Sequence, residues 1–210
     1  MANTAPKRVS KVEIQHMERS FAWPKPVEKE IQKIIAKYPA GREASAVIPL
    51  LTLAQKTFDG WLPVELMDLV AKTLNMPPVR VYEVASFYDM FFTEPVGKHV
   101  VRMCTNVSCM VCGAEEVLKA MEAELGVKAG QTTSDGLVTI QEFECLGACC
   151  EAPMAMIDDH YHVNLTPERA TEIMRDIKAG KAPKASSGRK PLADAAKPVK
   201  KASKTGSKKK

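Results

Sequence analysis

Apolar residues recur every three or four positions through the first half of the chain, and this spacing predicts a run of helices. In the first segment the apolar side chains stand at i, i+4, i+7 and i+8, at Val27, Ile31, Ile34 and Ile35. Three further segments cover about residues 43–58, 63–74 and 77–91. Pro49 lies early in the second, where it should kink or delay the first helical turns. We therefore expect a small bundle of four helices over residues 23–94.

After Pro95-Val96-Gly97 the pattern changes to short β-branched segments, which are typical of strands. The predicted elements are a strand over 98–103, a helix over 114–125 closed by Gly126, a strand over 136–143, a hairpin around Asp158-Asp159 and a last helix capped by Thr166. The order β-α-β-β-β-α is that of a thioredoxin-like sandwich. We assign this second domain, of mixed helix and strand, to residues 95–179.

The two ends of the chain differ from the body in composition and charge. Residues 1–22 are polar and predict a loose N-terminal arm, and residues 180–210 hold eleven Lys/Arg and one acid with almost no large apolar side chain. Such a segment cannot bury enough surface to offset its ordering entropy, so we expect a disordered basic tail. Residues 1–179 carry 19 basic and 24 acidic residues, so the positive net charge predicts no nucleic-acid binding by the body. The tail could serve to contact anionic lipid or an acidic partner surface.

All six cysteines lie between Cys104 and Cys150. The sequence shows no apolar run of the roughly 20 residues that a membrane span needs, and its N-terminus lacks the apolar region of a secretion signal. We therefore expect the chain to stay in a reducing, cytosol-like compartment. Clustered cysteines in such a compartment indicate metal or redox chemistry better than a disulfide framework.

The first cysteine group, CTNVSCMVCG from Cys104 to Gly113, fits several chemistries. Its C-x4-C-x2-C spacing is that of a plant-type ferredoxin, and Cys109-Met-Val-Cys112 alone is a thioredoxin-like redox pair. The plant-type hypothesis ranks low because a helix is predicted straight after Cys112, and the redox pair explains neither Cys104 nor the later cysteines. A zinc site would favour two C-x2-C pairs, and a Rieske site needs histidines inside the ligand loops, whereas the histidines of this chain lie outside them.

The second group, ECLGACCEAP, begins directly after the predicted strand that ends at Phe143. Both groups should therefore meet at one edge of the sheet, where two pairs of thiolates could bind a 2Fe-2S cluster. Gly147 and Ala148 would let backbone amides approach the inorganic sulfides. Cys112 can be a small buried apolar residue. Spacing does not choose between Cys149 and Cys150, although neighbouring side chains of an extended segment point opposite ways.

With these groups in place, the chain resembles the thioredoxin-like 2Fe-2S subunit, of the E type, of NADH:quinone oxidoreductase, respiratory complex I. The residues that carry the resemblance are GWLP at 60–63, VYEVASFY at 81–88, PVGK at 95–98, the first cysteine group through Gly113, CLGAC at 145–149 with Ala152-Pro153, and LTPE at 165–168. The resemblance covers about residues 20–179 and implies that the ligands are Cys104, Cys109, Cys145 and Cys149. Cys112, Cys150 and Met110 depart from the family pattern.

The resemblance also implies the partners and the place of the chain. It implies one 2Fe-2S cluster in this chain, and a larger flavoprotein partner that holds FMN and the NADH site, among other subunits of the peripheral arm. The complex would lie on the cytoplasmic, inner face of the plasma membrane, or on the matrix side in a mitochondrion. The equivalent subunit of a soluble NAD-linked formate dehydrogenase or hydrogenase is the nearest alternative. A thiol oxidoreductase and a zinc-stabilised adaptor are alternatives of other classes.

Overall fold

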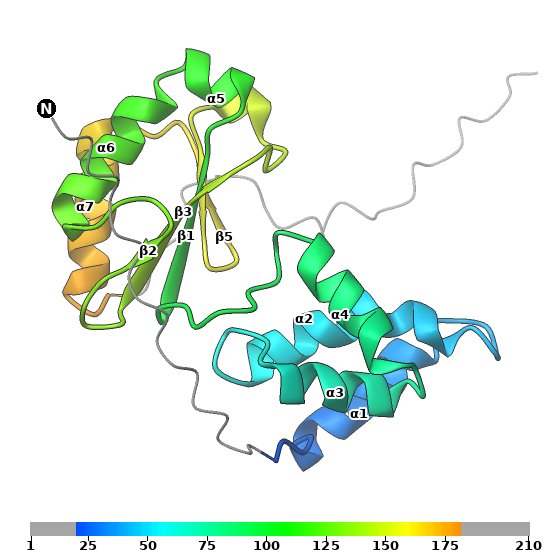
Figure 1. The fold of residues 1–210 in the computed structure, drawn as a ribbon. Helices are drawn as coiled ribbons and strands as arrows, with labels where there is room; N and C mark the ends of the chain where they lie inside the picture. The colour runs from blue at the N-terminus through cyan, green and yellow to red at the C-terminus, as the bar shows by residue number, and fades with distance from the viewer. Residues whose placement is uncertain (1–19, 182–210) are drawn as a thin grey trace, which may run out of the picture. The chain divides into compact units, whose positions relative to one another are not determined.

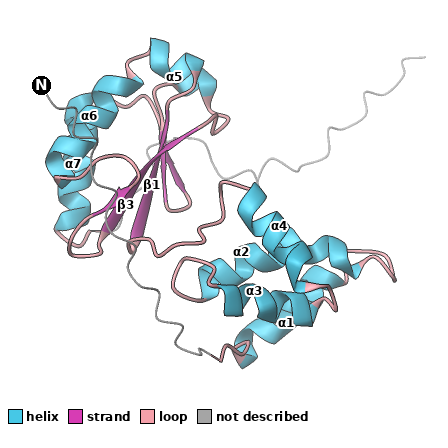
Figure 2. Ribbon diagram, viewed as in Figure 1, coloured by secondary structure: helices cyan, strands magenta, loops and turns pink. Residues whose placement is uncertain are grey.

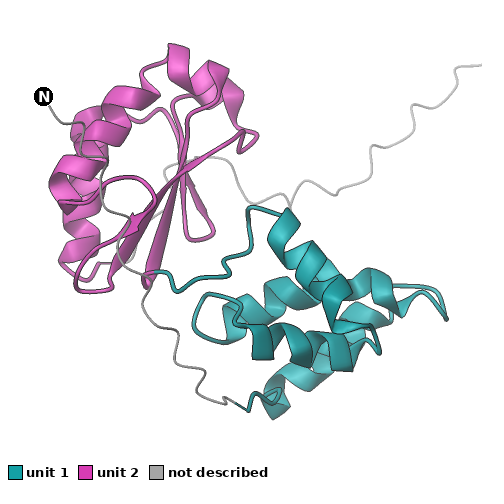
Figure 3. Cartoon of the chain, viewed as in Figure 1, with its two compact units in different colours: residues 1–96 teal, residues 97–210 magenta. Residues whose placement is uncertain are grey.

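A computed structural model describes residues 20–181 of the chain. The chain divides into two compact units, residues 1–96 and residues 97–210, which are coloured separately in Figure 3. The predicted loose arm lies outside the described residues up to position 19, and the predicted basic tail lies outside them from position 182. Within the described residues no helix is long and apolar enough to cross a membrane.

The first unit is helical, and its helices follow the apolar spacing of the sequence (Figure 1). They are α1 (Lys25–Ile35), the 3-10 helix η1 (Glu43–Ala46), α2 (Val47–Thr57), α3 (Val64–Thr73) and α4 (Pro78–Phe87). The predicted delay before Pro49 is present, because the segment from Glu43 forms a 3-10 helix and the α-helix begins only at Val47. Ile31, Leu50 and Leu66 are among the buried side chains that join these helices in one apolar core.

Helix α4 ends at Phe87, four residues earlier than the apolar pattern predicted. Tyr88 is extended, and a turn then brings the Phe91 amide to the Tyr88 carbonyl oxygen at 3.0 Å. This turn places Phe91 in the apolar core and lets the Phe92 carbonyl accept a hydrogen bond from the Leu62 amide at 2.7 Å. Packing of the aromatic residues therefore overrides the helical preference of the segment.

The second unit contains a mixed sheet with helices against it (Figure 2). Its described strands are β1 (His99–Cys104), β2 (Gln131–Thr132), β3 (Val138–Phe143), β4 (Ala155–Ile157) and β5 (His160–His162), in the order β2-β3-β1-β4-β5. β1 and β3 pair in parallel, and the other neighbours pair antiparallel. β4 and β5 form the predicted hairpin around Asp158, which adopts a left-handed φ of 53°. The two-residue strand β2 was not predicted.

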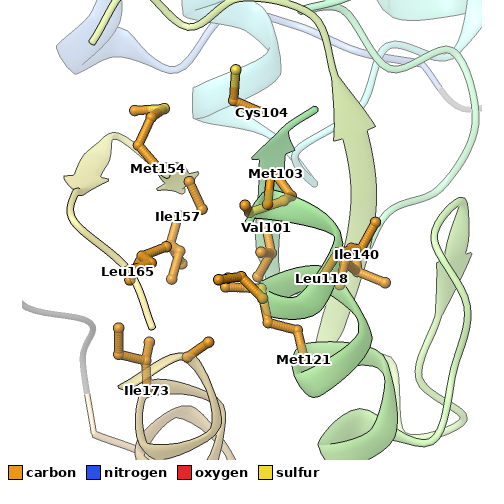
Figure 4. Packing of buried hydrophobic residues seen from close by; sticks show 14 of the residues in the cluster. Val101, Met103, Cys104, Leu118, Met121, Ile140, Met154, Ile157, Leu165 and Ile173 are labelled. Atoms are coloured by element: carbon orange, nitrogen blue, oxygen red, sulfur yellow. The ribbon is translucent and has the colours of Figure 1, made fainter. Parts of the chain in front are cut away.

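Helices α6 (Ala114–Leu125) and α7 (Pro167–Lys178) pack against each other and against one face of this sheet. Alternate residues of β1 and β3, such as Val101, Met103 and Ile140, enter the core with Met121 of α6. Figure 4 shows this core, with Cys104 and Met154 at one end of it. The predicted caps are present, since the Thr166 hydroxyl accepts the Arg169 amide at 3.2 Å and Gly126 ends α6 with a left-handed φ of 71°.

Two buried polar features connect the strands of this unit. The Thr139 hydroxyl accepts the Gly97 amide at 2.6 Å and lies 2.7 Å from the Thr132 hydroxyl. His162 is 1% exposed, and within residues 20–181 neither of its ring nitrogens has a hydrogen-bond partner. Burial first, and then the charge of Arg169, lower the pKa of His162 to about 4.

We predict that Gly97→Ala destabilises the second unit. A Cβ at residue 97 would lie 2.8 Å from the Val138 backbone carbon and 2.9 Å from the Thr139 nitrogen, so backbone must move. Overpacking of this kind costs about 1–3 kcal/mol. Hydrogen exchange should show faster exchange in peptides from β1 and β3. Gly41→Ala is the control, because nothing lies within 4 Å of its Cβ and its effect should be confined to the first unit. Unchanged protection in the Gly97 variant would contradict the prediction.

We also predict that the second unit loses stability between pH 7 and pH 5. The pKa of His162 is depressed in the folded chain, so the unfolded chain binds the proton first as the pH falls from 6.5 toward 4. At pH 5 the loss should amount to about 2 kcal/mol. Urea unfolding followed by far-UV circular dichroism would measure it. His162→Phe should remove most of this pH dependence, whereas His160→Phe, at an exposed position, should leave it in place.

Candidate metal centre

The parallel pairing of β1 with β3 brings the two cysteine groups to the same edge of the sheet. Cys104, the last residue of β1, is in register with Phe143, the last residue of β3. The Thr105 amide then donates to the Phe143 carbonyl oxygen at 3.1 Å, so the pairing continues to the point where the loops begin. Cys145 follows Phe143 by two residues. Both cysteine groups thus leave neighbouring strands at their carboxyl ends, as the sequence predicted.

The first cysteine group folds into a short helix that the sequence analysis missed. Asn106 caps α5 (Val107–Val111), with its side-chain oxygen accepting the Val107 amide at 2.7 Å. An Asn before an apolar residue is a recognised N-cap signal, but five residues are too few for a helical period to be visible. The turn of α5 buries Cys109 to 1% exposure and brings its thiol into hydrogen-bonding contact with that of Cys104.

The second cysteine group forms a tight loop followed by a 3-10 helix, η2 (Cys149–Glu151). Gly147 turns the chain with a left-handed φ of 83°, a conformation that glycine adopts without strain. The loop brings the sulfur atoms of Cys145 and Cys149 to 3.5 Å from each other. The Tyr161 hydroxyl donates to the Leu146 carbonyl oxygen at 2.8 Å, which ties this loop to β5.

The thiols of the two groups influence one another electrostatically. Burial and then the hydrogen bond with Cys104 raise the pKa of Cys109 to about 11, and the charge of Cys149 adds to this rise. The pKa of the Cys149 thiol is also raised, first by its hydrogen bond with Cys145, with a further contribution from Cys104. Four thiols this close cannot readily all ionise, because each thiolate repels the next. A bound cation would remove that obstacle, since metal binding releases thiol protons.

The arrangement of donors fits two metal ions better than one. Among residues 20–181, no three Cys, His, Asp or Glu side chains are grouped around a single ion position. The thiols form two pairs, Cys104 with Cys109 and Cys145 with Cys149. A structural zinc site needs four donors around one point, whereas a 2Fe-2S cluster takes four thiolates over two irons. The residues present therefore fit a 2Fe-2S cluster.

Cys112 and Cys150 lie outside both pairs. The interpretation of Cys112 as a buried apolar residue was wrong: it caps the C-terminus of α5 and is exposed. Cys150 is exposed as well, and it lies in η2 rather than in the extended segment assumed from the sequence. Their neighbours were identified correctly as cysteines of two loops, but the exposure of a thiol depends on the turn that holds it.

Three apolar side chains of α5 are exposed beside the thiols. Val107, Met110 and Val111 are 63%, 56% and 80% exposed. They lie on the same short helix as Cys109, whose own side chain faces inward. A group of exposed apolar residues next to a reactive site is typical of a surface that binds another protein.

Comparisons with known proteins agree with this description. Residues 31–178 match the family model of the thioredoxin-like [2Fe-2S] ferredoxins. The chain is 42% identical over 158 residues to the E-type subunit of NADH-quinone oxidoreductase from Rickettsia felis, which covers 75% of this chain and 95% of that protein. It is 42% identical over 152 residues to the mitochondrial NADH dehydrogenase [ubiquinone] flavoprotein 2 of Dictyostelium discoideum, covering 72% of this chain and 62% of that one.

Among solved structures, an NAD+-reducing [NiFe]-hydrogenase in its air-oxidised state aligns with a TM-score of 0.57 at 19% identity, over 72% of this chain and 28% of that chain. At this identity the likeness concerns the fold. The family model covers most of the chain, and the Rickettsia felis relative is matched over nearly its full length. The chain therefore belongs to the thioredoxin-like [2Fe-2S] ferredoxin family.

Proposed function

We propose that this chain is the electron-transfer subunit of an NADH:quinone oxidoreductase, and that it binds one 2Fe-2S cluster through Cys104, Cys109, Cys145 and Cys149. The observation that carries the proposal is the meeting of two thiol pairs where β1 and β3 end side by side. The names of the two relatives, one a part of NADH-quinone oxidoreductase and the other of NADH dehydrogenase, support the assignment to this enzyme.

The chain's own residues would hold the cluster half inside the protein. Cys104 and Cys109 are buried against the core, while Cys145 and Cys149 are exposed. When bound, the cluster supplies a store for one electron at a time, whereas NADH gives up electrons in pairs. The protein fixes the four sulfur atoms, keeps water from the buried pair, and leaves the other pair open toward a partner.

The partner in this proposal is a larger flavoprotein that holds FMN and binds NADH. The sequence of this chain offers no G-x-G-x-x-G motif after a strand, so the nucleotide is expected on the partner. Electron transfer slows steeply with distance, and the partner must therefore approach the edge that carries the cysteines. The exposed residues Val107, Met110 and Val111 lie at that edge, and we assign the docking surface to them.

We further propose that the chain is peripheral to the membrane, on the inner face of a bacterial plasma membrane or on the matrix side in a mitochondrion. The described helices supply no span. Its place at the membrane would therefore come from the other subunits of the complex.

We predict that Ser replacement of any of Cys104, Cys109, Cys145 or Cys149 abolishes or strongly alters the EPR signal of the dithionite-reduced protein. A serine oxygen is a harder and less readily ionised ligand than a thiolate, so the cluster should be lost or changed. Iron and sulfide analysis of the wild-type chain should give about two of each.

Cys112→Ser and Cys150→Ser are the matched controls for this experiment. Both cysteines lie within three residues of a proposed ligand, and both are exposed. Their variants should keep the wild-type signal and iron content. A signal lost in Cys112→Ser but kept in Cys145→Ser would overturn the ligand set, and zinc in place of iron in the wild type would overturn the proposed function.

We predict that Val111→Glu weakens binding to the flavoprotein partner at least tenfold, or about 1.4 kcal/mol. A carboxylate at this position would have to be desolvated in the interface. Native electrophoresis of the NADH-oxidising complex would show the chain released, with its EPR signal unchanged. Ala123→Glu, at an exposed position of α6, is the control and should remain bound. Equal retention of both variants would remove α5 from the interface.

A further inference from the structure

Ser108 connects the two thiol pairs through its side chain. It lies on α5, directly before Cys109, and is half-buried. Its hydroxyl hydrogen-bonds to the thiol of Cys149, which belongs to the other cysteine loop. A residue of the first loop therefore reaches across to a sulfur atom of the second.

The position of Ser108 is fixed from both sides. On the side of α5, its carbonyl oxygen accepts the Cys112 amide at 3.2 Å, which holds the helical turn. Across the loops, the Asn106 amide group donates to the Glu144 carboxylate at 2.9 Å. Asn106 thus caps α5 with its oxygen and grips the second loop with its nitrogen. The distance between Ser108 and Cys149 is held by this second link.

The hydroxyl of Ser108 can only act as a donor toward a thiolate ligand. A thiolate carries no proton, whereas a serine hydroxyl has one to give. Hydrogen bonds to the sulfur atoms of an iron-sulfur centre are one of the factors that set its reduction potential. Reduction adds a negative charge to the centre, and a donor stabilises the more negative state more strongly. The Ser108 hydroxyl should therefore make reduction more favourable.

We propose that Ser108 is a positioning residue that raises the reduction potential of the cluster by donating its hydroxyl hydrogen to the sulfur of Cys149. This inference rests on the proposed function, because it needs a cluster on these four thiols. It adds a role for a residue that is not a ligand and that comes from the opposite loop.

The test is a redox titration of the full-length protein followed by EPR. Ser108→Ala should lower the midpoint potential relative to the wild type, with iron content unchanged. We expect about a tenfold change in the equilibrium for reduction, which corresponds to about 59 mV for one electron. Ser108→Thr keeps the hydroxyl and should keep a potential near that of the wild type.

Ser108→Val supplies the matched comparison, because valine has the shape of threonine without the hydroxyl. If Ser108→Ala loses its cluster, the Thr and Val variants decide the question between them. Equal midpoint potentials in these two variants would overturn the proposal. Ser86→Ala controls for loss of a serine hydroxyl elsewhere, since Ser86 donates to the Tyr82 carbonyl oxygen within α4, and its potential should match the wild type.

A second measurement does not depend on the potential. In D2O, electron–nuclear double resonance of the reduced wild type should detect an exchangeable deuteron coupled to the cluster, and this coupling should be absent in Ser108→Val and present in Ser108→Thr. The same coupling in both variants would refute the hydrogen bond. Absence of any 2Fe-2S signal in the wild type would instead refute the proposed function, so the two failures are distinguishable.

Discussion

The hydrogen bonds between β1 and β3 run in one direction from His99 and Val138 to Cys104 and Phe143. Because the two strands are parallel, the chain leaves both at the same edge, and a loop from each can carry thiols to a common point. An antiparallel pair would have placed the loops at opposite edges. Helix α6 makes this pairing possible, since it is the crossover that returns the chain to start β3 beside β1.

The sequence predicted those parts of the structure that depend on local patterns. Apolar spacing located the helices of the first unit, Pro49 marked the late start of α2, and Thr166 marked the cap of α7. The two cysteine groups were placed correctly because each directly follows a β-branched segment. These are features in which a few neighbouring residues determine the outcome.

Other features escaped because they depend on distant contacts or on very short segments. Helix α5 and strand β2 have five and two residues, too few to show a period. The early end of α4 depends on packing of Phe91 in the core, and the exposure of Cys112 depends on the turn that buries Cys109. The link from Ser108 to Cys149 spans 41 sequence positions and follows from the register of two strands.

The close approach of Gly97 to β3 has a mechanical consequence. The connection from the first unit enters the sheet at the amino end of β1, where Lys98 and His99 donate to the carbonyl oxygens of Gly136 and Leu137. β1 is flanked on both sides by paired strands, β3 and β4. A pull or twist transmitted through residue 97 would meet this doubly hydrogen-bonded strand long before it reached Cys104. The sheet therefore acts as a stiff spacer that insulates the thiols from movement of the chain that precedes it.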